Sequence, residues 1–440
     1  MKKDSRRNFV KKTAALTTGV LTSTLPIDSF ANVSNDKKLK LALVGCGGRG
    51  SGAAVQALIA DENVELIAMA DVFKDRIEKS LEGIKEYFGD TKKINVNEKN
   101  IFIGFDSYIK AIDLCDVVIL TTPPGFRPLH FEYAVQNDKH IFMEKPLATD
   151  APGVRRVLDA ARVAKEKKLN VVVGLQRHYE NKYINLYNKL KSDAIGKIIS
   201  GQVYWNDGGV WVNKRKPEQT ELEYQMRNWY YFNWICGDHI LEQHIHNIDV
   251  ANWFIGEYPS TAQGMGGREV RNGKDHGHIF DHHFVEFHYP GGAVISSQCR
   301  HQKNTMRRVD EVFQGTKGSI TLGSGEIRDL SGNLKFSYPK NNNWESDDEP
   351  NPYQVEHDKL FKSIREGSVI SDAENGAKST LSAIMGRMAT YTGKKITWDE
   401  IMNSKESLVP DNLSWNSTPP ILPDEDGNYD VPVPGKTKFI

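Results

Sequence analysis

The amino-acid sequence predicts an α/β protein of two domains: a parallel sheet with helices on both faces, and then an open, mainly antiparallel sheet. Short apolar runs alternate with helical segments between residues 39 and 168. Strand-like runs separated by glycine turns follow one another between residues 281 and 323. The chain has 440 residues, which is enough for two hydrophobic cores.

A glycine-rich turn follows the first apolar run, 39–44, which is typical of a buried parallel strand. Gly45, Gly47 and Gly50 have the spacing G-x-G-x-x-G. The first glycine permits a tight turn, the second lets a pyrophosphate approach the backbone, and the third lets the helix pack on the strand. The helix expected over 52–60 would present its N-terminus to the phosphates.

A second apolar strand, 64–70, ends at Asp71, about twenty residues after the glycines. A carboxylate at this position accepts hydrogen bonds from an adenosine ribose. The combination of strand, glycines, helix, strand and acid predicts a dinucleotide site. Asp71 favours NAD because it would repel a 2′-phosphate, although Lys74 and Arg76 lie close enough to leave NADP open.

The rest of the first domain continues the alternation of strand and helix. The expected strands are 101–105, 117–121 and 140–143, and the expected helices are 74–88, 107–112 and 127–136. Ligands of doubly wound sheets bind beyond the carboxyl ends of the strands. The turn Thr122-Pro123-Pro124 is therefore expected to form a wall of the nicotinamide pocket.

Composition excludes several classes of function. Lys plus Arg and Asp plus Glu both number 57, so the formal net charge is zero. This balance argues against a nucleic acid or an anionic membrane as the main partner. There is no run of eighteen apolar residues that could span a membrane. The four cysteines have no metal-site spacing and are expected to be buried free thiols: Cys46, Cys115, Cys236 and Cys299.

The N-terminus resembles a twin-arginine export signal, expected over residues 1–31. Ser5-Arg6-Arg7-Asn8-Phe9-Val10-Lys11 precedes an apolar run, and Ser29-Phe30-Ala31 suits a signal peptidase. The alternative is a disordered basic tail. The resemblance implies export to the periplasm by the twin-arginine machinery and, without a nearby cysteine, no lipid anchor. An exported enzyme meets no cytosolic NAD pool, so its cofactor should be tightly held and recycled within the site.

The strand 139–143 ends in Glu144-Lys145-Pro146. Together with the glycine loop, the Thr-Pro turn and His130, this resembles the Gfo/Idh/MocA oxidoreductase family over about residues 39–404. The resemblance implies a Rossmann NAD-binding domain over 38–168 and a C-terminal α/β domain with an open antiparallel sheet over 169–410. An extended arm is expected over 411–440.

The expected cofactor site combines the glycine loop with positions that the resemblance implies. Lys145 matches the family lysine that lies near the nicotinamide and the reacting hydroxyl, where it can orient that hydroxyl and take part in proton transfer. The predicted cofactor-binding residues are Gly45, Gly47, Gly48, Arg49, Gly50, Asp71, Thr121, Pro123, His130, Glu144, Lys145 and Gln176.

A helix, 151–168, and a strand, 170–175, are expected around the boundary between the two domains. The other expected helices are 184–190, 351–367 and 372–391, and the other expected strands are 197–205, one at Val270, 281–289, 293–299, 308–315 and 319–323. Aromatic residues are dense between 204 and 234. They could stack on sugars or could be ordinary packing.

We expect one helix over 237–249 with an apolar stripe and a polar stripe. The polar stripe comprises His239, Glu242, His246 and Asp249. The family usually has Asp-x-x-x-His here, so the resemblance implies that His246 is the general base, with Glu242 in place of the aspartate. The predicted catalytic residues are therefore Lys145, His246 and Glu242.

Other polar and aromatic side chains are expected around the substrate. The predicted substrate-binding residues are Arg177, His178, Trp205, Trp229, Tyr230, His239 and Asp249. His239, Glu242 and His246 are also metal-ligand types, and His282 or His283 could add to them. Most members of the family use no metal, so none is predicted.

The sequence thus predicts an exported NAD-dependent oxidoreductase that acts on a sugar or glycoside hydroxyl, with oxidation at C3 as the most attractive case. One alternative is a redox-neutral, NAD-dependent glycoside hydrolase. Another is a sugar-binding protein in which the nucleotide is structural. The open sheet face is expected to support a homo-oligomer.

Overall fold

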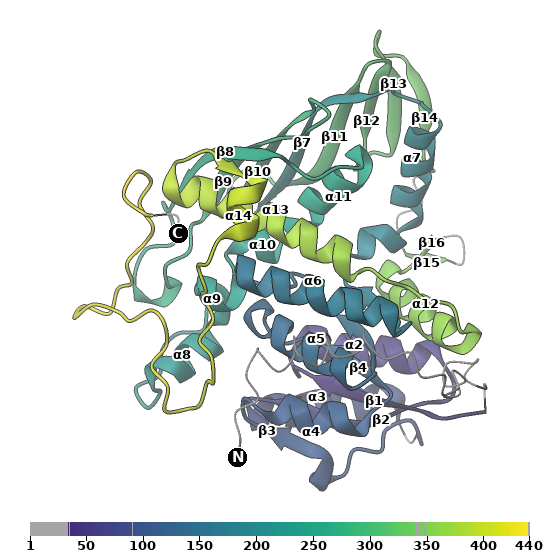
Figure 1. Cartoon of the computed structure of the whole chain (residues 1–440), viewed down its shortest axis with the longest axis vertical. Helices are drawn as coiled ribbons and strands as arrows, with labels where there is room; N and C mark the ends of the chain where they lie inside the picture. The colour runs from purple at the N-terminus through teal and green to yellow at the C-terminus, as the bar shows by residue number, and fades with distance from the viewer. Residues whose placement is uncertain (1–33, 35, 90, 340–343, 347–348, 439–440) are drawn as a thin grey trace, which may run out of the picture.

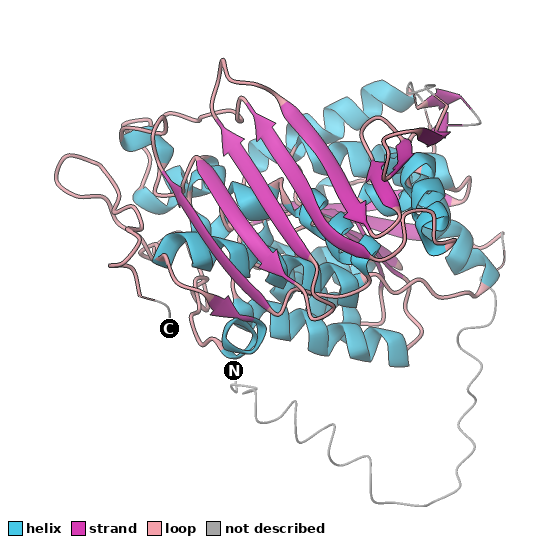
Figure 2. Cartoon of the chain, turned by 90° about the horizontal axis from the view of Figure 1, so that it is seen from above, coloured by secondary structure: helices cyan, strands magenta, loops and turns pink. Residues whose placement is uncertain are grey.

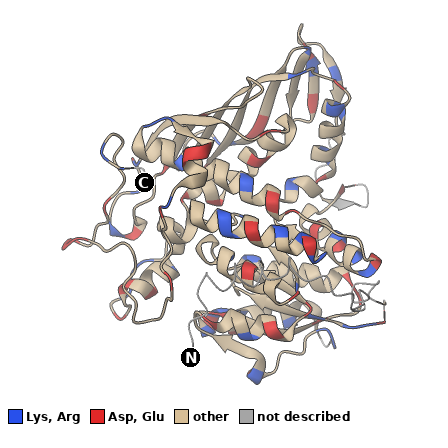
Figure 3. Cartoon of the chain, viewed as in Figure 1, with Lys and Arg blue, Asp and Glu red and all other residues tan. Residues whose placement is uncertain are grey.

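A computed structural model describes residues 34, 36–89, 91–339, 344–346 and 349–438. The predicted export signal lies outside these residues. Figure 1 shows the two α/β domains one above the other, with the N-terminal domain below. Lysine and arginine alternate with aspartate and glutamate along the ribbon of both domains (Figure 3). No helix of the described residues is long and apolar enough to cross a membrane.

The N-terminal sheet has six parallel strands in the order β3-β2-β1-β4-β5-β6. The strand order reverses between β1 and β4, which is where doubly wound sheets bind ligands. The strands are β1 (Leu39–Val44), β2 (Val64–Asp71), β3 (Ile101–Ile103), β4 (Val117–Leu120), β5 (His140–Met143) and β6 (Val171–Val173). β1 and β4 are apolar and almost wholly buried, as expected for a sheet covered on both faces.

The helices of this domain include one that comes from far along the chain. The helices are α2 (Gly48–Ala60), α3 (Lys74–Phe88), α4 (Ser107–Leu114), α5 (Arg127–Gln136), α6 (Ala151–Glu166) and α12 (Pro352–Glu366), with short 3-10 turns at Glu98–Asn100, Pro124–Phe126 and Gln176–Tyr179. α12 packs against α2. Arg365 on α12 donates to both carboxylate oxygens of Asp61 at 2.7 and 3.0 Å.

The second sheet has nine strands in the order β14-β13-β12-β11-β7-β10-β9-β8-β17. All neighbours are antiparallel except β7 and β10. The strands are β7 (Ile198–Asp207), β8 (Thr261–Gly267), β9 (His282–His288), β10 (Val294–His301), β11 (Arg308–Gly315), β12 (Gly318–Thr321), β13 (Glu326–Asp329), β14 (Leu334–Ser337) and β17 (Ile396–Thr397). Figure 2 shows that helices leave one face of this sheet uncovered. The mainly antiparallel sheet of the prediction is confirmed.

A long buried helix, α13 (Ala373–Thr392), packs against α6 of the first domain and against β8 and β9 of the second. It therefore ties the two domains together. The other helices are α7 (Asn181–Lys191), α8 (Glu221–Arg227), α9 (Asn233–Cys236), α10 (His239–Glu242), α11 (Ile245–Ile255) and α14 (Trp398–Asn403), with 3-10 turns at Trp229–Tyr231 and Lys274–His276 and a small hairpin of β15 (Glu345–Ser346) and β16 (Glu349–Pro350).

The strand predicted at Val270 is wrong. Val270 lies in a turn. The backbone N–H groups of Glu269, Val270 and Arg271 all donate to one carboxylate oxygen of Asp281. The prediction missed β8, β13, β14 and β17 of this sheet. Of these, β8 reads Thr-Ala-Gln-Gly-Met-Gly-Gly. Its three glycines give it the composition of a loop, and only pairing with β9 makes it a strand.

The chain after α14 runs as an extended segment over α9 and α8 and then returns (Figure 1). Trp415 contacts Phe73 and Phe105 of the first domain, with ring centroids 5.4 and 4.9 Å apart. Tyr429 is buried, and its hydroxyl donates to Glu221 of α8 at 2.6 Å. This segment therefore contacts both domains.

Candidate active site

The glycine loop between β1 and α2 has the shape that a dinucleotide requires. Gly45 has φ +95°, and a Cβ there would lie 2.4 Å from the Thr122 nitrogen. A Cβ on Gly50 would lie 2.1 Å from the Gly45 oxygen. In contrast, Cβ atoms on Gly47 and Gly48 would meet no atom within 4 Å. The loop is closed toward the sheet and open above the N-terminus of α2, so it leaves room for a pyrophosphate.

Asp71 ends β2 beside this loop. Its carboxylate accepts the N–H groups of Cys46 at 2.7 Å and Phe73 at 2.9 Å. Burial raises the pKa of Asp71, and these two hydrogen bonds oppose the shift. The acid is thus fixed next to the glycine loop, where the ribose of a dinucleotide would lie.

The turn after β4 is supported from behind by His130. Thr121 Oγ1 donates to the Gly45 oxygen at 2.6 Å, and Thr122 Oγ1 lies 3.1 Å from His130 Nδ1. The His130 ring is buried and stacks on Tyr108 with centroids 4.2 Å apart. Burial lowers the pKa of His130 to about 3, so the ring is neutral. Its structural role is to hold the turn that contains Pro123.

Arg49 and Glu144, both predicted to bind the cofactor, contact each other. Arg49 Nε donates to Glu144 Oε1 at 2.6 Å, which links the first turn of α2 to the end of β5. The guanidinium lies 5.1 Å from the centre of the Tyr353 ring and 3.7 Å from Glu356, both on α12. Gln176, in the 3-10 turn after β6, keeps a buried side-chain oxygen with no hydrogen-bond partner among the described residues.

Lys145 and Glu242, both predicted to be catalytic, form a direct ion pair across the two domains. Lys145 Nζ donates to Glu242 Oε2 at 2.7 Å and to the Glu242 backbone oxygen at 2.5 Å. Burial raises the pKa of Glu242, and the positive charge of Lys145 opposes that shift. The pair fixes the Lys145 ammonium beyond the carboxyl end of β5 in the parallel sheet.

His246, the predicted general base, lies in the first turn of α11 and stacks on Trp205 with centroids 5.9 Å apart. Its Nδ1 is buried without a partner among the described residues, and Nε2 is the nitrogen that reaches the accessible surface. Burial, assisted by the charge of Lys145, lowers the pKa of His246 well below its ordinary value. A neutral imidazole with an accessible nitrogen can accept a proton.

The single helix predicted over 237–249 is wrong. α10 ends at Glu242 and α11 begins at Ile245. Between them, the His244 side chain contacts Ser297 of β10, with its Nε2 2.7 Å from the hydroxyl. This contact gives the buried His244 side chain a hydrogen-bond partner on the sheet.

The break also disperses the polar stripe that the uninterrupted helix would have formed. His239 Nδ1 lies 2.8 Å from Asp238 Oδ1, while Asp249 Oδ2 lies 2.6 Å from His178 Nε2. Neither His239 nor Asp249 faces the ion pair of Glu242. His239, Glu242 and His246, considered above as metal ligands, do not form such a group among the described residues. The one candidate group there is Asp238, His239 and His283.

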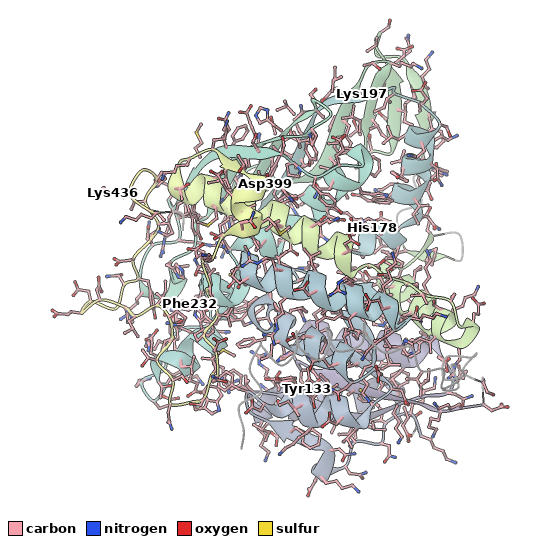
Figure 4. All side chains as sticks on the ribbon, viewed as in Figure 1. Tyr133, His178, Lys197, Phe232, Asp399 and Lys436 are labelled. Atoms are coloured by element: carbon pink, nitrogen blue, oxygen red, sulfur yellow. The ribbon has the colours of Figure 1, made fainter. Side chains whose placement is uncertain are left out.

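Arg177 and His178, both predicted to bind substrate, form contacts that link the two domains. Arg177 forms a buried ion pair with Glu311 of β11, and Asn247 donates to the same carboxylate at 2.6 Å. His178 lies between the domains and stacks on Trp253 with centroids 4.2 Å apart (Figure 4). Burial acts to lower the pKa of His178, but the carboxylate of Asp249 outweighs it and the pKa is raised.

The aromatic segment reaches from the surface to the catalytic cluster. Trp211 is 45% exposed and contacts Trp229 and Tyr230, with centroids 5.8 and 6.3 Å apart. Tyr230 stacks on His301, whose Nε2 lies 2.5 Å from Oε1 of Gln243. The buried Tyr230 hydroxyl has no partner among the described residues. The sequence reasoning missed His301 and Gln243. Gln243 lies inside the predicted helix 237–249, and His301 follows the predicted strand 293–299.

Family models match most of the chain. The model described as "Oxidoreductase family, NAD-binding Rossmann fold" matches residues 39–175, and "Oxidoreductase family, C-terminal alpha/beta domain" matches residues 188–397. The chain belongs to the Gfo/Idh/MocA oxidoreductase family. Its N-terminal domain is an NAD-binding Rossmann domain, as predicted.

Three curated relatives have different activities in their names. The 2,7-anhydro-N-acetylneuraminate hydratase of Escherichia coli is 26% identical over 51% of this chain and 55% of its own length. Inositol 2-dehydrogenase of Salmonella paratyphi B is 27% identical over 51% and 57%. A glycosyl hydrolase family 109 protein of Shewanella baltica is 22% identical over 51% and 49%. The chain therefore spans about half the length of the curated relatives it matches.

Solved structures share the fold over a larger part of the chain. Levoglucosan dehydrogenase in complex with NADH and L-sorbose has a TM-score of 0.64 at 17% identity. The match covers 82% of this chain and 98% of that one. At this identity the likeness concerns the fold alone.

Proposed function

We propose that the protein is an NAD-dependent oxidoreductase that acts on a carbohydrate hydroxyl. The observation that carries the proposal is the cluster of Lys145, Glu242 and His246. In this cluster a fixed ammonium and a neutral, accessible imidazole lie between an NAD-binding domain and its partner domain. The named dehydrogenase relatives act on inositol and levoglucosan, which are polyhydroxylated rings.

Each residue of the cluster has a separate task. NAD, held by the glycine loop and Asp71, would supply the acceptor for a hydride. His246 Nε2 removes the proton of the substrate hydroxyl, and Lys145 donates a hydrogen bond to the same oxygen and stabilises its developing negative charge. Glu242 positions Lys145 through the 2.7 Å ion pair.

The aromatic residues fit a ring-shaped substrate. Trp205 stacks on His246, so a sugar that contacts this indole would present a hydroxyl to the imidazole. Trp229 and Tyr230 extend the aromatic surface outward to Trp211. Within this proposal we favour a glycoside oxidised at C3, with the aglycone toward the exposed tryptophan.

The proposal includes export and cofactor recycling. A periplasmic enzyme would keep its NAD bound and would reoxidise it with a second substrate in the same site. The uncovered face of the nine-stranded sheet in Figure 2 would be the contact surface of a homo-oligomer.

A second candidate is a redox-neutral reaction, because two of the relatives are named as a hydratase and a glycosyl hydrolase. In such a cycle, oxidation at C3 makes the C2 proton acidic, the aglycone is eliminated, water adds, and the ketone is reduced again. The same His246 and Lys145 would serve the oxidation and the reduction.

One experiment separates these candidates. The protein, still carrying the nucleotide with which it is isolated, is mixed with chromogenic glucosides and galactosides, and reduced nicotinamide and released aglycone are followed together. The proposal predicts reduced nicotinamide in proportion to enzyme, with no aglycone. Sustained aglycone release without lasting reduction would identify the redox-neutral reaction, and tight NAD without either signal would identify a binding protein.

A further inference from the structure

Three buried side chains of metal-ligand type converge at the start of α10, outside the catalytic cluster. They are Asp238, His239 and His283 of β9, and one donor atom of each lies within 4.8 Å of the other two. All three side chains have no exposed surface. No other group of this kind is present in the described part of the chain.

The hydrogen bonds around His283 leave its Nε2 nitrogen facing Asp238. The Thr390 hydroxyl on α13 lies 2.9 Å from the Arg387 carbonyl oxygen and 2.8 Å from His283 Nδ1. When this hydroxyl donates to Arg387, its oxygen accepts the hydrogen on Nδ1, and Nε2 carries the lone pair. That lone pair is directed at Asp238 Oδ2, 3.4 Å away.

In that tautomer two acceptors face each other in a buried site, where unpaired lone pairs are costly, and a metal ion between them would satisfy both. His239 adds a second imidazole to the group, because its Nδ1 lies 2.8 Å from Asp238 Oδ1. The Nε2 atoms of both histidines have no hydrogen-bond partner among the described residues.

Asp238 is held as metal-bound carboxylates usually are. It accepts the backbone N–H of Phe280 at 3.0 Å, the N–H of His239 at 2.5 Å and the hydroxyl of Tyr391 at 2.5 Å. Phe280 and Tyr391 donate to Oδ2, and the His239 N–H donates to Oδ1. These bonds orient the carboxylate and leave a lone pair of Oδ1, on the side of His239 Nδ1, for a metal ion. Phe280, His239 and Tyr391, from three parts of the domain, thus fix the aspartate between the two imidazoles.

We propose that Asp238, His239 and His283 bind a divalent transition metal ion of the zinc type. Imidazole nitrogen and carboxylate oxygen are the donors that zinc accepts in proteins. A fourth donor would come from water or from His278, which is fully buried and has both ring nitrogens unpartnered among the described residues. The ion would fix the start of α10 to β9, and the end of α10 carries Glu242.

The first test is the metal content of the full-length protein purified from zinc-supplemented cells. The expected result is about one zinc per chain, and cobalt added to chelator-treated protein should give the visible absorption bands of a four-coordinate site. His283→Ala should lose the metal. His282→Ala is the matched control, because this neighbour on the same strand is 42% exposed and bonds Asp281 instead.

Tyr391→Phe is a second variant that keeps all three ligands and removes only one hydrogen bond to the carboxylate. It should weaken metal affinity about tenfold, measured by competition with a chromogenic chelator. Wild-type protein with less than about one-tenth of a metal ion per chain, and no cobalt bands, would overturn the proposal. Nε2 of His283 would then be a hydrogen-bond donor to Asp238. Neither result depends on the substrate of the enzyme.

Discussion

His246 and His178 differ in the partners that the tertiary structure gives them. His178 bonds the carboxylate of Asp249, and its pKa is raised. His246 has no carboxylate partner among the described residues and stacks on Trp205, and its pKa is lowered. A raised pKa favours the charged ring, and a lowered pKa favours the neutral ring, which can accept a proton. The proposed roles of the two histidines, His246 as a base and His178 as a domain-bridging residue, rest on this difference.

The largest effect that would test this comparison is at His246 and Lys145. Each of His246→Gln and Lys145→Met is expected to lower kcat/KM about 10²- to 10⁴-fold, because proton transfer and oxygen polarisation are lost. Nucleotide content, measured by absorbance after denaturation, should stay unchanged. His178→Gln is the control, and a loss of similar size there would contradict the assignment of roles.

The next effect concerns the pH dependence of activity. Glu242 must be ionised to hold Lys145, and its pKa is raised by burial. Activity should therefore fall as the pH drops through the raised pKa of Glu242. In Glu242→Gln we expect kcat/KM to be about tenfold lower near neutral pH and its acid limb to flatten. The check is a pair of pH–rate profiles. An acid limb that persists unchanged in the variant would assign it to another group.

His178 should affect stability rather than chemistry. Its folded-state pKa lies above the unfolded value, so its contribution is fully present below about pH 6.5 and is lost as the pH rises through the folded pKa. His178→Gln should lower the free energy of unfolding by about 1–3 kcal/mol at pH 6 and by less at pH 9. Urea denaturation at both values measures this. An equal loss at pH 6 and pH 9 would contradict this role of the charged pair.

The smallest effect is expected at the outer aromatic residues. Trp211→Ala should raise KM several-fold for glycosides with an aromatic aglycone and leave kcat unchanged, because a stacking contact is worth about 0.5–1.5 kcal/mol. Steady-state kinetics with aromatic and methyl glycosides measure this. Trp344→Ala is the control, since that tryptophan contacts Tyr353 near α12. Equal sensitivity for both glycosides would place the aglycone elsewhere.

Much of the first domain could be predicted because its signals are local. α3, α5 and β5 have the predicted bounds, and the glycine loop has the predicted form. A buried parallel strand is apolar throughout, and a dinucleotide turn needs glycines at fixed spacings. Lys145 and His246 could be found from a resemblance to family motifs. The ion pair of Lys145 with Glu242 follows from neither motif by itself.

The tertiary structure alone decided the partners of buried polar side chains. The sequence contains Arg177, but its partner Glu311 lies 134 residues away. The stretch 237–249 has an uninterrupted helical pattern, yet α10 ends at Glu242, α11 begins at Ile245, and His244 between them bonds β10. β8 is a strand only because β9 pairs with it. Local patterns specify which surfaces are apolar and where the chain can turn, whereas buried hydrogen bonds and charges depend on whichever distant group the fold brings within reach.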